Sequence, residues 1–316
     1  MDKKLEERRK AVLDLINCSD DGDTDTSELS EKEIEELNRI ASEMLNDGDA
    51  DEDSEDIYCY LDLAYNAGSR KKRIEYAEKA LSLEPDNIDA MLAKAIAVSK
   101  EPEDELAAIS EVVQKAGKAL EAEGYFKNDI GSFWGIWETR PYMRARAIYC
   151  HRLIGCGKLR LAEKEAKDLL MLSEDDNLGI RFALAYIYMH LEDEDGMKKL
   201  LADYLESAES TDFLLPLAAL YYKLGNLTAS AGCLAELTGL NPGAKDFIKD
   251  CASDFGAVMQ YAAREKSFEA VCCHSMEELL NALIEYSITF TTLESFFKWA
   301  VTATKSTRKK KTEAKK

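Results

Sequence analysis

The chain has three histidines and eight cysteines, the side chains that most often bind zinc or act as nucleophiles. Cys150, His151 and Cys156 lie close enough in sequence to be considered as a metal-ligand group. Their spacing matches no zinc signature. Cys150 also falls at a position that holds small interior residues in a sequence repeat, which accounts for it without a metal. A structural role is therefore favoured over a metal site.

Cys272, Cys273 and His274 form a second candidate metal group, which Cys251 could join. Successive residues of a helix point about 100° apart, so adjacent cysteines suit a shared ligand site poorly. The sequence also has no phosphate-binding glycine loop, dinucleotide fingerprint, nucleophile elbow or HExxH motif. It therefore predicts a protein that is not an enzyme and that has no cofactor and no metal.

Two acidic runs, 20–25 and 47–56, are candidates for calcium loops. An EF-hand loop needs Gly at its sixth position and Glu at its twelfth. Counted from the first Asp of the second run, these positions hold Glu52 and Tyr58. The first run likewise lacks Gly at the sixth position and Glu at the twelfth. A solvated acidic linker is therefore favoured over a specific calcium site.

The formal net charge of −20 and the pI near 4.7 restrict the classes of partner. Binding of nucleic acid through phosphate neutralisation needs an excess of Lys and Arg, which the body of the chain does not have. No stretch reaches the length of apolar residues that a membrane span requires. The N-terminus is charged from its first residues and does not resemble a signal peptide. We therefore expect a cytoplasmic location.

The segment 143–244 divides into three equal windows: 143–176, 177–210 and 211–244. Their length of 34 residues is typical of helix-turn-helix repeats. Two antiparallel helices that pack closely need small residues where they cross, and a turn residue between them. The eighth, fifteenth and twentieth positions follow this rule in most windows: Cys150, Leu184 and Ala218; Gly157, Leu191 and Gly225; Ala162, Gly196 and Ser230.

Two further windows, 54–87 and 88–121, precede this segment in phase with each other. The first ends in Glu75-Tyr-Ala-Glu-Lys-Ala-Leu-Ser-Leu-Glu-Pro-Asp-Asn87. This ending resembles the Ala-Leu-x-Leu-x-Pro pattern of the tetratricopeptide repeat (TPR) family. Pro85 stops the helix because it has no N–H to donate, and Asn87 can cap the next helix. The resemblance implies an all-α fold, a right-handed α-solenoid of antiparallel helix pairs with helical caps.

An insertion at 122–142 separates the two groups of repeats. It holds two of the three tryptophans, and glycines interrupt it. One interpretation is a structural plug over the broken stacking interface. The other is an aromatic lip that offers a partner large rigid side chains, formed by Phe133, Trp134 and Trp137.

The ends of the chain differ from the repeats. Residues 1–53 form an acidic segment that we expect to be partly helical or flexible. Residues 245–304 should form capping helices, because a repeat stack exposes an apolar face at its end. Within them, the β-branched stretch from Ile288 to Thr292 could instead be a loop or short strand. Residues 305–316 form a basic tail that is predicted to be disordered.

The TPR resemblance implies that the first helix of each repeat lines a concave groove. The predicted groove is acidic and aromatic in its first half, and its second half collects basic side chains. Such a basic lining would favour an acidic peptide or a C-terminal carboxylate. The alternative is that Arg144 and Arg181 pair with acidic residues of the array. The residues predicted for the groove are Tyr58, Asp62, Tyr65, Arg144, His151, Arg181, Tyr188, Tyr222 and Lys223.

The sequence therefore predicts a non-enzymatic scaffold or adaptor that binds a protein or peptide segment in this groove. The carboxylate clamp of chaperone-binding TPR proteins is absent, because the matching positions hold Tyr58 and Asp62, or Ala147 and His151. Two alternatives stay open. One is an RNA- or ribosome-associated factor that uses the basic tail, and the other is a regulatory subunit of an enzyme complex.

Overall fold

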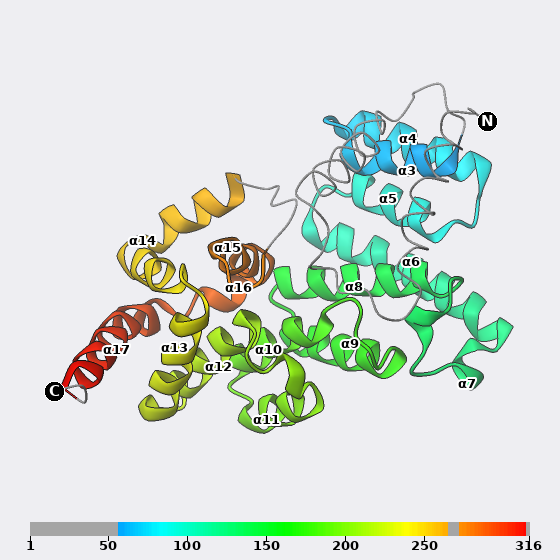
Figure 1. The fold of residues 1–316 in the computed structure, drawn as a ribbon. Coiled ribbons are helices and arrows are strands. Elements are labelled where there is room, and N and C mark those ends of the chain that lie inside the picture. Colours follow the sequence, from blue (N-terminus) through cyan, green and yellow to red (C-terminus); the bar gives the residue numbers. More distant parts are fainter. Residues whose placement is uncertain (1–55, 265–271, 314–316) are drawn as a thin grey trace, which may run out of the picture. The chain divides into compact units, whose positions relative to one another are not determined.

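The computed structural model describes residues 56–264 and 272–313, except for the side chains of 306–313. The contacts divide the chain after Glu55, and all described residues belong to the second unit, which begins at Asp56. These residues are helical, with short turns and no strand among them. This confirms the all-α class (Figure 1). The acidic segment 1–53 lies outside the described residues.

Each of the five predicted windows holds two helices that contact each other. The boundaries agree with the 34-residue phase to within a few residues. The pairs are α3 (Ile57–Asn66) with α4 (Arg70–Leu83), α5 (Ile88–Val98) with α6 (Pro102–Glu123), α8 (Arg140–Gly155) with α9 (Leu159–Leu172), α10 (Ile180–Leu191) with α11 (Glu194–Asp203), and α12 (Thr211–Lys223) with α13 (Leu227–Leu240).

Local side chains set where these helices begin and end. Ser69 accepts from the Lys72 amide at 3.2 Å to cap α4, and Asn87 accepts from the Ala90 amide at 3.0 Å to cap α5. The turns after α8 and α12 place Gly157 and Gly225 at φ values of 69° and 78°, which glycine adopts without strain. The repeat positions therefore correspond to real caps and turns.

Small residues lie where the two helices of a repeat cross. The Cys150 Sγ is 3.6 Å from the Ala162 carbonyl oxygen, and the Ser230 hydroxyl donates to the Ala218 carbonyl at 2.6 Å. The eighth and twentieth positions therefore face each other in these two windows. In the window 177–210 the glycine at the twentieth position faces another residue of α10, because a Cβ on Gly196 would lie 2.8 Å from the ring of Tyr188.

Gly196→Ala is expected to lower the free energy of unfolding by about 1–3 kcal/mol, because the new methyl overlaps a nearly buried ring. Gly232→Ala is the matched control. It also lies inside a helix, but nothing lies within 4 Å of its added Cβ. The control should raise stability by about 0.5–1 kcal/mol through helix propensity. Urea unfolding measures both, and equal effects would contradict the close approach.

The first helices of successive repeats lie side by side, since α3 contacts α5, α5 contacts α8, α8 contacts α10, and α10 contacts α12. Three of the second helices also pack against the first helix of the next repeat: α4 on α5, α6 on α8, and α9 on α10. The insertion does not break this sequence of contacts, because α6 still packs on α8. The first helices therefore form one continuous face of the described unit.

The insertion is shorter than expected, because α6 runs to Glu123 and α8 begins at Arg140. Between them lie α7 (Tyr125–Asn128) and the 3-10 helix η2 (Phe133–Gly135). Phe133 is fully buried, and its ring packs against Phe126 at 5.1 Å and Tyr142 at 6.4 Å. The insertion thus packs beside α6 and α8, which also contact each other directly, so there is no broken stacking interface for it to cover.

The C-terminal helices are α14 (Ala244–Arg264), bent at Asp254, α15 (Met276–Glu285), α16 (Ser287–Phe290) and α17 (Glu294–Glu313). Helices α14 and α17 pack on α13, at the end of the array. The stretch from Ile288 to Thr292 begins in the short helix α16 and ends in a turn, so the strand alternative does not hold. One expectation needs correction. The backbone of α17 continues through Glu313, so most of the tail predicted to be disordered is helical.

Candidate functional site

The downstream half of the predicted groove is covered by the chain's own C-terminal helices. Helix α15 contacts α12, and α16 contacts α8 and α10, so these two helices lie on the first-helix face (Figure 1). The Nδ1 atom of His151 is 2.7 Å from a carboxylate oxygen of Glu285 on α15. The ring of Tyr222 packs against Phe296 at 5.6 Å and Trp299 at 5.1 Å. Neither predicted groove residue faces an open groove.

Tyr286 and Phe290 are the side chains that hold this cover in place. Tyr286 stacks on Tyr186 of α10 with ring centroids 4.5 Å apart, and Phe290 packs on the same ring at 5.4 Å. Tyr186 is fully buried, and this burial raises its pKa well above the usual value. Sequence reasoning missed all three, because no repeat position singles them out.

A carboxylate lies in this same interface. Asp212, in the first turn of α12, accepts at 3.4 Å from the hydroxyl of Tyr186. Burial, together with the neighbouring charges of Glu278 and Glu285, raises the pKa of Asp212 to about 7. The contact between α12 and α15 therefore contains acidic groups that repel one another when ionised.

The basic side chains predicted for the downstream groove are already paired within the protein. A guanidinium N–H of Arg181 donates to the carboxylate of Asp176 at 3.0 Å. The ammonium of Lys223 donates to the carbonyl oxygen of His190 at 2.8 Å and lies 3.3 Å from Glu192. These contacts match the alternative in which the basic residues pair inside the array. They remove the main argument for an acidic peptide.

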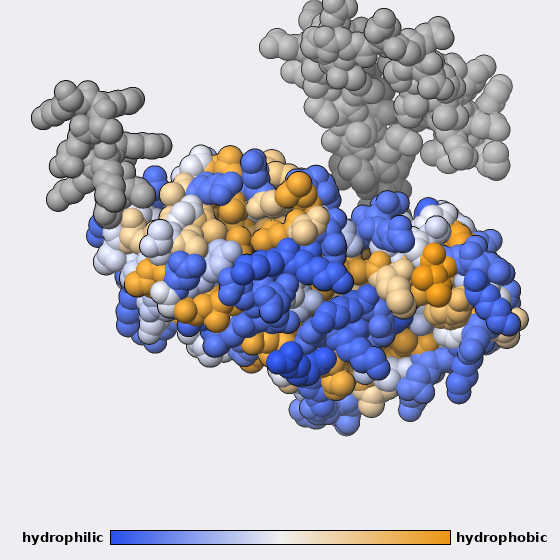
Figure 2. Space-filling view, turned by 90° about the horizontal axis from the view of Figure 1, so that it is seen from below, coloured by the Kyte–Doolittle hydropathy of each residue, from blue (hydrophilic) through white to orange (hydrophobic). Residues whose placement is uncertain are grey.

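Tyr188 points away from the predicted groove. It is only 4% exposed, and the ammonium of Lys167 on α9 lies 5.4 Å from its ring centroid. It helps to line a cavity of about 960 Å³ between α9 and α11, with Lys199 and Asp203 among the other lining residues. Figure 2 shows the face on the side of α11, where hydrophilic residues run across the middle with hydrophobic residues on both sides.

The upstream half of the face is open among the described residues. Tyr58 is 68% exposed and Tyr65 is 45% exposed, and Asp62 lies exposed between them on α3. The side-chain amide of Asn66 donates to the Asp62 carboxylate at 2.7 Å, and no described Lys or Arg pairs with it. This helix therefore presents two phenol rings and a carboxylate without a cationic partner among the described residues.

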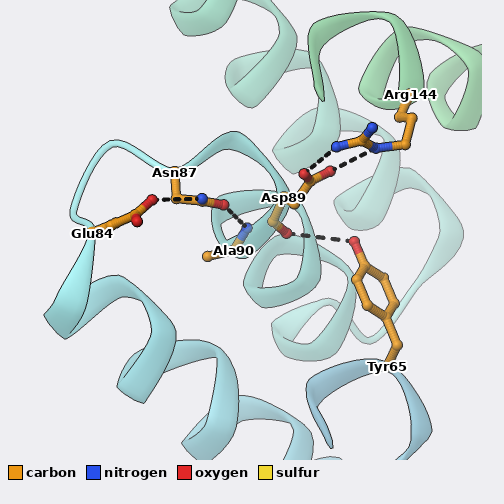
Figure 3. A network of polar contacts seen from close by, with 6 residues as sticks. All are labelled: Tyr65, Glu84, Asn87, Asp89, Ala90 and Arg144. Atoms are coloured by element: carbon orange, nitrogen blue, oxygen red, sulfur yellow. Dashed lines mark hydrogen bonds and ion pairs between the residues drawn. The ribbon is translucent and has the colours of Figure 1, made fainter. Parts of the chain in front are cut away.

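A polar network joins this helix to the next two first helices (Figure 3). The Tyr65 hydroxyl donates to the Asp89 carbonyl oxygen at 3.4 Å, at the start of α5. The Arg144 guanidinium on α8 binds the Asp89 carboxylate with two N–H groups, one of them at 3.1 Å. Because Asp89 neutralises Arg144, Asp62 is the exposed charge that remains. We name the set Tyr58, Asp62, Tyr65, Asp89 and Arg144 the upstream face.

The predicted aromatic lip does not form as a unit. Phe133 is buried, Trp134 is partly buried, and only Trp137 is largely exposed, at 70%. The Arg140 guanidinium lies 5.6 Å from the Trp134 ring and 5.2 Å from the Trp137 ring. Phe133 therefore belongs to the core, whereas Trp134 and Trp137 both contact the Arg140 guanidinium.

The candidate metal ligands are not brought together. Across residues 56–264 and 272–305, no group of three His, Cys, Asp or Glu side chains is arranged to hold a metal ion. The side chains of the first candidate group instead contact protein groups, as Cys150 does at Ala162. In the part of the chain that is described, no helix combines the length and apolar character needed to cross a bilayer.

Burial should make two of the described thiols unreactive. It raises the pKa of both Cys150 and Cys251 to about 12, whereas Cys272 and Cys273 are exposed. Iodoacetamide at pH 8 is expected to label the exposed pair and to label the buried pair only in denaturant, because the thiolate is the reactive form. Mass spectrometry reads out each site. Labelling of Cys150 in the native protein would contradict its placement between α8 and α9.

No model of a known protein family matches the chain, and no curated protein matches it either. What the protein binds is therefore inferred from the chemistry of its own side chains. On the upstream face, Tyr58, Asp62 and Tyr65 are exposed, and contacts between helices hold Tyr65, Asp89 and Arg144 in place.

Proposed function

We propose that this protein is a non-enzymatic interaction scaffold, a TPR-like α-solenoid that binds a peptide segment of another protein on its upstream face. The observation that carries the proposal is the exposed pair Tyr58 and Tyr65 on α3. Exposed tyrosines give a partner large and rigid contact area at a small cost in side-chain entropy.

The repeat arrangement supports a solenoid. Helix pairs recur with a 34-residue phase, and the first helices of neighbouring repeats pack side by side. In such an array each repeat contacts its neighbours, and the aligned helices form an extended binding surface. The bond from Tyr65 to Asp89 and the pair of Asp89 with Arg144 fix the three helices relative to one another. A peptide would therefore meet a preorganised surface.

The covered downstream half limits where that peptide can lie. Tyr286 and Phe290 occupy the surface of α10 that a groove ligand would use. The binding site is accordingly assigned to α3, α5 and the start of α8. No observation on the described residues favours the RNA-associated or enzyme-subunit alternative, so neither is proposed.

A displayed library of 12-residue peptides, selected on the full chain, tests this function. Selected peptides should lose binding to a Tyr58→Ser/Tyr65→Ser variant and keep it with Tyr261→Ser, whose side chain is also exposed, at 54%, but lies on α14. Charge reversal of Arg144 or Arg181 is a poorer test, because each supports an internal ion pair. Equal binding to all three proteins would refute the assignment.

A further inference from the structure

Resting on the proposed function, we infer that the upstream face takes a cationic segment of its partner, with Arg or Lys side chains over Tyr58 and Tyr65 and in contact with Asp62. The faces of aromatic rings attract cations, and an adjacent carboxylate adds a charge-assisted hydrogen bond. This reverses the acidic partner expected from the sequence, because Asp89 already neutralises Arg144.

The three side chains have a spacing that suits such a segment. They lie at positions i, i+4 and i+7 of α3, which places them along one side of the helix. Seven residues of a helix rise roughly 10 Å, and three residues of a peptide in the polyproline II conformation rise about 9 Å and complete one turn. In that conformation residues i and i+3 point to the same side, so a peptide with a basic residue at every third position can place one cation over each ring, with Asp62 between them.

The charges around this site favour a cation over an anion. The chain carries a formal net charge of −20, and Asp62 has no cationic partner among the described residues. The nearest basic group of the network, Arg144, gives two N–H groups to Asp89. An anionic segment would have to approach Asp62 without any free described cation of the upstream face to compensate.

The described chain uses the same contact elsewhere on its surface. The Lys79 ammonium lies 5.6 Å from the ring centroid of Tyr60 and 5.2 Å from that of Tyr76, in the same repeat as the upstream tyrosines. The Arg140 guanidinium lies over Trp137. Those rings already have a cation, whereas no cation lies over Tyr58 or Tyr65 among the described residues.

The test measures fluorescence anisotropy of three labelled probes, (Gly-Ser-Arg)4, (Gly-Ser-Glu)4 and (Gly-Ser-Asn)4, titrated with the full-length protein. Salt at about 0.15 M screens charges that lie more than about 8 Å apart. The site variant is Tyr58→Ser/Asp62→Asn. The matched control is Tyr261→Ser/Glu236→Gln, which removes one exposed phenol and one exposed carboxylate at other places on the surface.

We expect the Arg probe to bind wild type, to bind the site variant about tenfold more weakly, and to bind the control variant with unchanged affinity. An equal loss in both variants would mean attraction to the net charge alone and would overturn the inference, as would absence of binding by the Arg probe. Binding of the Glu or Asn probe in its place, weakened by the site variant, would overturn the cationic preference and leave the proposed function standing.

Discussion

Replacing Tyr286 by Ala is expected to lower the free energy of unfolding by about 3–5 kcal/mol, the cost of removing a large aromatic side chain from a core. Tyr286 is nearly buried, and its ring stacks on Tyr186 and lies 6.0 Å from the ring of His151. The truncation leaves a cavity between α15 and α10, and the helices on both sides cannot close it without moving.

The measurement is urea unfolding followed by far-ultraviolet circular dichroism, with Tyr261→Ala as the control. Because Tyr261 is 54% exposed, its truncation should change stability by no more than about 0.5 kcal/mol. If Tyr286→Ala were as mild as this control, the C-terminal helices would not be a structural part of the first-helix face. The downstream half of the groove would then be open to a partner.

The second large expected effect is a dependence of the folding stability on pH, caused by Asp212. The folded protein holds the pKa of this carboxyl at about 7, against 3.8 for the free group. The native state therefore binds the proton more tightly than the unfolded chain does, and stability falls as pH rises from about 4 to about 7. At about 1.4 kcal/mol per pH unit, the ionised form costs the fold on the order of 2–4 kcal/mol above pH 7.

Asp212→Asn removes this cost and keeps an oxygen that can accept from the Tyr186 hydroxyl. The favourable effect of a negative charge at a helix N-terminus, about 0.3–1 kcal/mol, is smaller and does not reverse the sign. We expect the variant to be more stable than wild type at pH 8 and the difference to shrink toward pH 4.5. Denaturant unfolding at several pH values measures it. A difference independent of pH, or a less stable variant at pH 8, would contradict the account of this interface.

The helix pairs could be predicted because their signals are local. The small residues at Cys150, Ala162 and Gly196, and the turn glycines, recur with a fixed period, and each acts within its own repeat. Pro85 and Asn87 likewise mark the end of one helix and the start of the next. Short-range geometry therefore determined most of the helix boundaries.

Whether the predicted groove is open or covered could not be predicted, because this depends on contacts between residues far apart in the chain. The stretch 276–290 has the apolar pattern of any amphipathic helix, and nothing in that pattern says that Tyr286 meets Tyr186. The 34-residue period alone also placed Tyr188 on the groove side. Because Gly196 has no side chain, the ring of Tyr188 can instead pack toward α11. The pairing of Arg144 with Asp89 depends in the same way on a distance between helices.

Hydrogen–deuterium exchange of the full chain, with and without a library-selected peptide, tests the central claim most directly. We expect slower amide exchange in α3 and α5 on binding, with α10 and α12 unchanged, because α15 and α16 already cover the latter two. Slower exchange across α10 and α12, with none in α3, would show that the partner displaces the C-terminal helices and would contradict the assignment of binding to the upstream face.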